Sequence, residues 1–147
     1  GMNTKFIELA GEINTAMPAY VVEKLTNALN SAKKPVKGSK VLILGIAYKK
    51  NVDDVRESPS LEIMKILKAK GAEIFYSDPF FDYFPKTRKY FFDLQSIELS
   101  KKIIKSFDAL ILATDHDSFN YDLIEKNSKI LIDTRGRFMT TDSIIRA

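Results

Sequence analysis

One stretch of the sequence indicates the fold: an apolar run, VLIL (residues 41–44), is followed by a charged segment, GIAYKKNVDDVRESPS (residues 45–60). Consecutive apolar residues are typical of a strand that is buried on both faces of a parallel sheet. Pro59 begins a helical pattern, and Ser58 is its predicted N-cap. The charged segment therefore connects a buried strand to a helix, which is where open α/β sheets bind ligands.

The charged segment lacks the glycine pattern of a dinucleotide-binding turn, because Gly45 is its only glycine. A phosphate group bound here would be held by Lys49, Lys50 or Arg56, together with main-chain N–H groups at the start of the next helix. We therefore expect side chains, rather than a glycine-rich loop, to make the ligand contacts.

Strands and helices alternate on both sides of this stretch. We expect strands at residues 40–44, 73–77, 109–114 and 130–133, and helices at 59–70, 95–105 and 121–126, with the aromatic-rich residues 80–94 unassigned. This alternation predicts an α/β fold, a Rossmann-like three-layer domain with a mainly parallel sheet. In that fold the first and third strands are neighbours, so residues 45–56, 114–119 and 133–137 converge on one rim.

A helical segment precedes this domain. Residues 5–30 are expected to be helical, and Pro18 suits the first turn of a helix, so that residues 5–13 would form a separate, shorter helix. Residues 30–39 read as a polar linker with Pro and Gly. We therefore divide the chain into a helical segment and linker (1–36) and a compact domain (37–147).

Composition restricts the chemistry of the 147 residues. Cysteine is absent and His116 is the single histidine, which excludes disulfides, thiolate sites and a Cys nucleophile and argues against a metal site. The net charge of +4 comes without a long basic block, so we expect no nucleic-acid partner. No apolar run is long enough for a membrane span and no signal peptide is evident, so a cytoplasmic protein is expected. Gly1 before Met2 is typical of a tag-cleavage scar.

Several polar residues of the rim have two readings each. Tyr48 and Lys49 could stack a base and hold an oxyanion, or could be ordinary surface residues. Arg56 could bind a phosphate group, or could form ion pairs with Asp53 and Asp54 that hold the loop together. These two aspartates could bind a hard cation together with Asp115, but the basic residues between them favour charge neutralisation instead.

The other two rim segments leave similar alternatives open. Asp115 and His116 could be a catalytic acid–base pair, although a lone histidine is more often structural. Arg135 and Arg137 could bind an anionic ligand or form surface ion pairs, and Gly136 between them suggests a tight turn.

These motifs together resemble one family. G-x-A-Y-K (45–49) and D-D-x-R-x-S-P-S (53–60), with D-P (78–79), T-D-H-x-x-F (114–119) and I-D-T-R-G (132–136), resemble the C-terminal, UDP-binding domain of the UDP-glucose/GDP-mannose dehydrogenase family. Upstream, E-I-N-x-x-M-P-x-Y-V-V (12–22) is similar to the helix that leads out of the family's central dimerisation domain. Among the branches of the family, the residues in these motifs most resemble those of the UDP-N-acetyl-D-mannosamine dehydrogenases.

The resemblance implies an NAD-dependent oxidation of a UDP-sugar at C6, through a thioester on a cysteine, in polysaccharide biosynthesis. It implies that Tyr48, Lys49 and Arg135 contact the UDP-sugar and that Arg56 reaches toward NAD. It also implies association with the missing domains, or a homodimer through the N-terminal helix.

The sequence lacks the family's cysteine, its NAD-binding glycine motif and its central-domain lysine. We therefore expect no catalytic residue in this chain and no activity of the chain alone. Two alternatives remain: a stand-alone Rossmann-like nucleotide-binding or regulatory module without catalysis, and an interaction domain whose apolar helix pairs with a partner.

Overall fold

The computed structural model describes residues 2–56, 58–87 and 90–147, with side chains from Met17 onward. Within these residues five strands form one parallel sheet in the order β2-β1-β3-β4-β5. The strands are β1 (Lys40–Leu44), β2 (Glu73–Ser77), β3 (Ala109–Leu112), β4 (Leu131–Asp133) and β5 (Ile144–Arg146). The predicted α/β fold with neighbouring first and third strands is confirmed.

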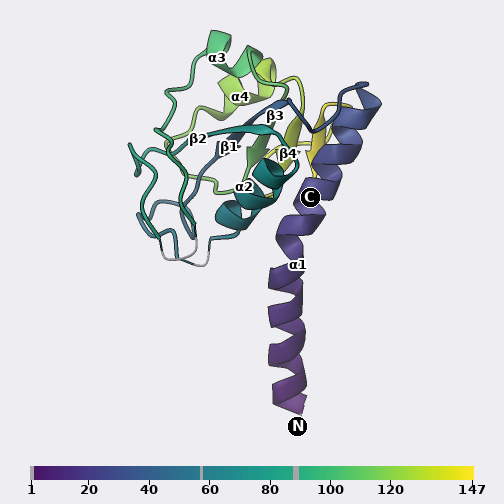
Figure 1. Cartoon of the computed structure of the whole chain (residues 1–147), viewed down its shortest axis with the longest axis vertical. Helices are drawn as coiled ribbons and strands as arrows, with labels where there is room; N and C mark the ends of the chain where they lie inside the picture. Colours follow the sequence, from purple (N-terminus) through teal and green to yellow (C-terminus); the bar gives the residue numbers. More distant parts are fainter. Residues whose placement is uncertain (1, 57, 88–89) are drawn as a thin grey trace.

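Helices cover both faces of the sheet, which gives three layers (Figure 1). Alternate residues of each strand point to opposite faces. Val41 and Ile43 of β1 pack with α1 (Met2–Ser31) and α2 (Pro59–Ala69), whereas Leu42 and Leu44 pack with α3 (Lys101–Lys105) and α4 (Tyr121–Asn127). Burial on both faces explains why the strands are continuous apolar runs.

The predicted start of α2 is confirmed in detail. Ser58 is the N-cap, its side-chain oxygen accepts a hydrogen bond from the Ser60 main-chain N–H (3.3 Å), and Pro59 occupies the first turn. The apolar side of the helix buries Leu61, Met64 and Leu67 against the sheet. The helix is thereby fixed with its N-terminus at the carboxyl ends of the strands.

The prediction of two helices near the N-terminus is wrong. A single helix, α1, runs from Met2 to Ser31 with Pro18 in its interior. Proline removes one helical hydrogen bond, but the turns that follow are held because Val21, Leu25 and Leu29 are buried in the core of the sheet domain. Figure 1 shows the earlier part of α1 projecting away from that domain.

Within the described residues, no helix has both the length and the apolar character needed to cross a bilayer.

Two further differences concern the chain after β2. The predicted helix at 95–105 is shorter, because regular structure begins at Lys101 after the N-cap Ser100. β5 was not predicted, since three residues carry too little periodicity to indicate a strand, and it forms only by pairing with β4 at the sheet edge. The unassigned residues 80–94 contain no helix or strand where they are described, apart from an isolated bridge between Tyr83 and Gln95.

Candidate functional site

The candidate site is the rim formed by the carboxyl ends of β1, β3 and β4. The chain leaves β1 toward β2 on one side, while β3 lies on the other side, so the winding of the sheet reverses between β1 and β3. At such a reversal the loops that follow the two strands lead to helices on opposite faces of the sheet, here α2 and α4, and this is the usual ligand position in open α/β sheets. Here the two loops are residues 45–58 and 113–120.

The two loops touch at their first residues. Gly45 has φ +86°, and a Cβ atom on it would lie 2.5 Å from the main-chain oxygen of Thr114. Thr114 Oγ1 donates a hydrogen bond to the carbonyl of Ala47 (2.8 Å). Ser60 Oγ, from the first turn of α2, donates to the carbonyl of Gly45 (2.9 Å). The single glycine of the charged segment therefore permits close contact between backbones.

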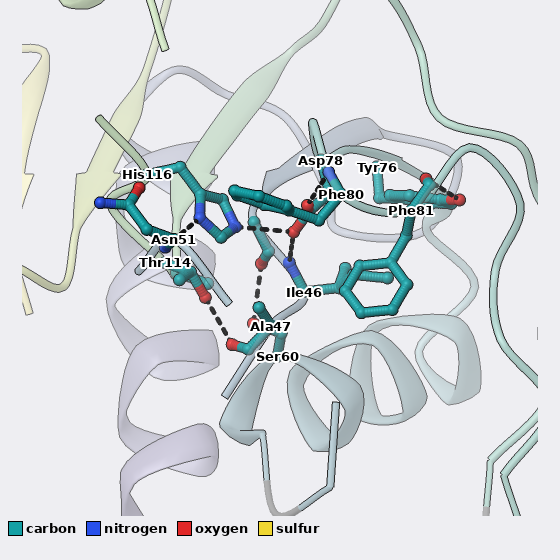
Figure 2. Close-up of polar contacts among 12 residues, drawn as sticks. Ile46, Ala47, Asn51, Ser60, Tyr76, Asp78, Phe80, Phe81, Thr114 and His116 are labelled. Atoms are coloured by element: carbon teal, nitrogen blue, oxygen red, sulfur yellow. Dashed lines mark hydrogen bonds and ion pairs between the residues drawn. The ribbon is translucent and has the colours of Figure 1, made fainter. Parts of the chain in front are cut away.

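A buried histidine connects the segments that follow three strands. His116 and Asp78 are fully or almost fully buried, with exposed fractions of 0% and 2%. His116 Nε2 lies 2.9 Å from Asp78 Oδ2, and the Asn51 main-chain N–H donates to His116 Nδ1 at 2.7 Å (Figure 2). We call Asp78, His116 and the Asn51 main chain the His116 bridge. Use of both ring nitrogens in internal hydrogen bonds favours the structural reading of His116 over a catalytic one.

The side chain of Asn51 adds a second connection between the same loops. Its Nδ2 donates to Asp117 Oδ2 (2.7 Å), and its Oδ1 accepts the Asp117 main-chain N–H (3.0 Å). The hydrogen bond from Asn51, together with the charge of Lys50, lowers the pKa of the Asp117 carboxyl. Asn51 has φ +61°, a backbone conformation that asparagine tolerates better than most residues.

Tyr48 and Lys49 lie on the outward part of this loop. The side chain of Tyr48 is about half exposed (49%), and its main-chain N–H donates to the carbonyl of Asp54 (2.5 Å). Lys49 is exposed. Among the residues that the structure describes, no ion pair involves Lys49. The loop thus presents an aromatic ring and an ammonium group to solvent, and their roles toward a ligand remain predictions.

Arg56 forms a two-pronged pair with one of the aspartates predicted as partners. Its Nε and Nη2 donate to the two carboxylate oxygens of Asp54 at 3.1 and 2.9 Å. These hydrogen bonds lower the pKa of the Asp54 carboxyl. The Arg56 side chain is nevertheless 85% exposed, so pairing with Asp54 leaves it accessible to solvent. Its predicted contact with a cofactor remains a prediction.

Arg135 and Arg137 converge on a single carboxylate. Arg135 Nε donates to the Ala113 carbonyl (2.9 Å) and lies 4.0 Å from Asp115 Oδ1, and Arg137 Nη1 lies 3.8 Å from Asp115 Oδ2. Arg137 also covers the ring of Tyr121, 4.1 Å from the ring centre. Arg135 is therefore fixed at the β3–β4 side of the rim, with a third of its side chain exposed.

Three residues that organise the rim were not assigned roles from the sequence. Asp78 and Asn51 belong to the His116 bridge, and buried Asp133 accepts the main-chain N–H groups of Arg135 and Phe138 at 2.9 Å each. An aspartate at the carboxyl end of a buried strand was the available signal, since Asp78 directly follows β2 and Asp133 is the last residue of β4. No signal identified Asn51, because its function depends on a partner 65 residues away.

Two surface cavities of the described residues lie away from the rim. One, of about 340 Å³, is lined by α2 and residues 90–92, and the other, of about 290 Å³, lies between α1 and α2. Within the described residues no group of three or more His, Asp or Glu is placed to hold a metal ion.

Comparison with known proteins identifies the family. Residues 42–140 match the model of the "UDP-glucose/GDP-mannose dehydrogenase family, UDP binding domain". The chain is 36% identical over 142 residues to a UDP-N-acetyl-D-mannosamine dehydrogenase of Methanococcus maripaludis, covering 91% of this chain and 31% of that protein. It is 30% identical over 144 residues to a UDP-glucose 6-dehydrogenase of Rickettsia bellii, covering 92% and 32%.

Solved structures agree with the sequence comparison. A UDP-D-ManNAc dehydrogenase from Pyrococcus horikoshii superimposes with a TM-score of 0.74 at 28% identity, over 95% of this chain and 32% of that one. The chain thus spans about a third of the length of the relatives it matches. It belongs to the UDP-glucose/GDP-mannose dehydrogenase family and corresponds to that family's UDP binding domain.

Proposed function

We propose that this chain binds the UDP part of a nucleotide sugar at the rim between β1 and β3, as one part of an NAD-dependent nucleotide-sugar 6-dehydrogenase. The observation that carries the proposal is the family match, which begins in β1 and includes all three rim loops. Tyr48 and Lys49 present a ring and an ammonium group on the loop at the winding reversal. Stacking on a uracil base and attraction of a diphosphate are the interactions that these groups offer.

Arg135 is proposed to contact the phosphates from the opposite side of the rim. Its guanidinium is held by the Ala113 carbonyl and lies near Asp115, which leaves part of its donor set for a ligand. Two cations from different loops would then flank the diphosphate, and Arg135 would be held there by the neighbouring loop after β3.

The chain does not fit the main NAD site of such an enzyme. Gly45 stands alone where a dinucleotide-binding turn has three glycines, and the sequence has no cysteine to carry a thioester. Arg56 is the one residue for which we propose a contact with NAD, through its exposed side chain. We accordingly assign the oxidation to other parts of the enzyme and propose that the chain alone is inactive.

We extend the proposal to partners and cellular role. Association with the remaining domains, or with a second copy through α1, would cover the helix where it projects from the sheet domain (Figure 1). The dehydrogenase would act in the cytoplasm, in the synthesis of sugar precursors for polysaccharides.

Calorimetric titration of the chain with UDP and with UDP-N-acetylmannosamine tests the proposal. We expect binding by the wild type and at least about tenfold weaker binding by Lys49→Ala, the usual scale for a charged hydrogen bond. Lys126→Ala, which removes an exposed lysine from α4, is the control and should bind as the wild type does. Absence of UDP binding by the wild type would contradict the proposal, and NADH formation by the isolated chain would contradict the assignment of the oxidation elsewhere.

A further inference from the structure

In the His116 bridge, two buried polar side chains, His116 and Asp78, hold the loop after β1 by hydrogen bonds. The Asn51 main-chain N–H donates to His116 Nδ1, so this nitrogen carries no proton, and the proton of the neutral ring is on Nε2, which donates to Asp78. Asp78 Oδ2 also accepts the Ile46 main-chain N–H at 2.8 Å. One carboxylate therefore holds the beginning of the loop directly and its middle through the histidine.

The residues between these two attachment points carry the proposed ligand contacts. Ile46 and Asn51 are held at their main-chain nitrogens, and Tyr48 and Lys49 lie between them. No side chain of the bridge is exposed to a ligand, because His116 and Asp78 are buried. The bridge can therefore affect a ligand only through the loop.

The histidine ring is itself held in position by two aromatic side chains. The ring centres of Phe80 and Phe119 lie 4.9 and 5.6 Å from that of His116. Asp78 is fixed in turn, since its Oδ1 accepts the Phe80 main-chain N–H at 2.8 Å. A hydrogen-bond acceptor is thereby presented to Asn51 at a defined place.

We propose that His116 and Asp78 are positioning residues, which fix residues 46–51 so that Tyr48 and Lys49 are held in their ligand-binding arrangement. The identity of the ligand rests on the function proposed above, whereas the effect on the loop does not. If the bridge were merely structural, its loss would destabilise the whole domain equally. If the bridge positions the loop, its loss should destabilise residues 46–51 more than the rest of the domain.

Three substitutions of His116 separate its two hydrogen bonds. His116→Phe keeps an aromatic ring and removes both nitrogens. His116→Asn places an oxygen near the position of Nδ1 and keeps the acceptor for Asn51, whereas His116→Gln places its amide nitrogen near Nε2 and keeps only the donor to Asp78. Phe119→Leu is the matched control, because it loosens the packing around the ring without removing a hydrogen bond.

Amide hydrogen exchange measured by NMR without ligand gives the first readout. We expect His116→Phe and His116→Gln to speed exchange of the Tyr48 and Asn51 amides by at least about tenfold, the factor associated with one hydrogen bond, while β1 amides keep their protection. His116→Asn should retain protection of Asn51. Equal loss of protection in β1 and the loop, or no change in the loop, would overturn the proposal.

Nitrogen-15 spectra of the imidazole give an independent readout, because His116 is the single histidine of the sequence. We expect Nδ1 to give the signal of an unprotonated acceptor and Nε2 that of a protonated nitrogen. A proton on Nδ1 would overturn the bridge, since Asn51 would then face a donor instead of an acceptor.

UDP titration completes the test. We expect at least about tenfold weaker UDP binding in His116→Phe than in Phe119→Leu, and recovery of affinity in His116→Asn. If wild type and His116→Phe bind UDP equally, positioning is overturned and the proposed function stands. If the wild type does not bind UDP, the proposed function fails, and the exchange experiment alone decides whether His116 fixes the loop.

Discussion

Two segments leave neighbouring strands at the same edge of the sheet and are held by different physical means. Residues 45–58 follow β1, and residues 78–96 follow β2, which lies beside β1 in parallel register. The first segment is held by hydrogen bonds to Thr114, His116 and Asp117. The second has main-chain hydrogen bonds within itself, such as Phe84 N–H to the Leu94 carbonyl (3.0 Å), but it is anchored to the core by aromatic rings. Phe84 is in edge contact with Tyr76 and Phe92 at ring-centre distances of 5.8 and 5.1 Å.

The difference shows how a loop can be ordered while its outer side chains stay exposed. Hydrogen bonds are directional and act on the main chain, so they fix residues 46–51 without burying Tyr48 or Lys49. Aromatic packing gains free energy from buried area, so it orders a segment by covering its side chains. The first device suits a ligand-binding loop, and the second suits a cover for the core.

The largest expected effect is at the point where the β1 loop meets the β3 loop. Gly45→Ala places a methyl group 2.5 Å from the Thr114 carbonyl oxygen in a backbone conformation with φ +86°, and we expect a loss of roughly 4 kcal/mol in the free energy of unfolding. Urea unfolding measures it. Gly38→Ala is the control, because Gly38 has a similar φ of +83° but nothing within 4 Å, and it should cost only about 1–2 kcal/mol. Equal losses in the two variants would refute the steric explanation.

Removing a ring from the aromatic segment is the next largest change. Phe84 is 6% exposed, and Phe84→Ala should lower the free energy of unfolding by about 3 kcal/mol through the cavity it leaves. Exchange of the Asn51 amide should rise no more than global unfolding requires, because the β1 loop is held separately. Phe91→Ala, at an exposed ring, should cost about 0.5 kcal/mol. Selective opening of the β1 loop in Phe84→Ala would show that the two segments are coupled.

At alkaline pH the aromatic segment should weaken. Burial, assisted by the charges of Asp78 and Asp82, raises the pKa of Tyr76 from 10.0 to about 12, and its hydroxyl donates to the Phe81 carbonyl at 2.9 Å. Because the folded pKa is raised, this stabilisation is present below pH 10 and is lost as pH rises toward 12. Urea midpoints across this range should fall more steeply for wild type than for Tyr76→Phe. Parallel pH profiles would argue against this role of Tyr76.

The smallest expected effect is a loss of stability at acid pH that is confined to the loop after β1. Hydrogen bonding by Asn51 lowers the pKa of Asp117 below its ordinary value of 3.8. The contribution of this carboxylate to stability is therefore present above pH 3.8 and is lost as pH falls through the lower folded value. Amide exchange of Asn51 should accelerate in that range in wild type. In Asp117→Asn the acid dependence should disappear, and its persistence there would assign the effect to another group.

The sequence alone was sufficient for the layered core and for much of the rim. The apolar runs at 40–44 and 73–77 specify strands with the observed bounds, and Ser58-Pro59 specifies the start of α2, because these signals are local and periodic. The same reasoning placed Tyr48, Lys49 and Arg56 on the loop after β1. Local pattern was also enough to anticipate the pairing of Arg56 with an aspartate two residues away.

Tertiary structure decided what the local pattern leaves open. Pro18 lies inside a helix because the following turns are buried in the core, and β5 exists because β4 offers it a partner. The path of residues 80–94 was not predictable, because aromatic content indicates burial without specifying a backbone shape. His116 receives its place from Asp78, 38 residues before it, and from Asn51, 65 residues before it. Sequence determines which side chains can form hydrogen bonds, but only the folded chain brings a donor and an acceptor so far apart in sequence within reach of each other.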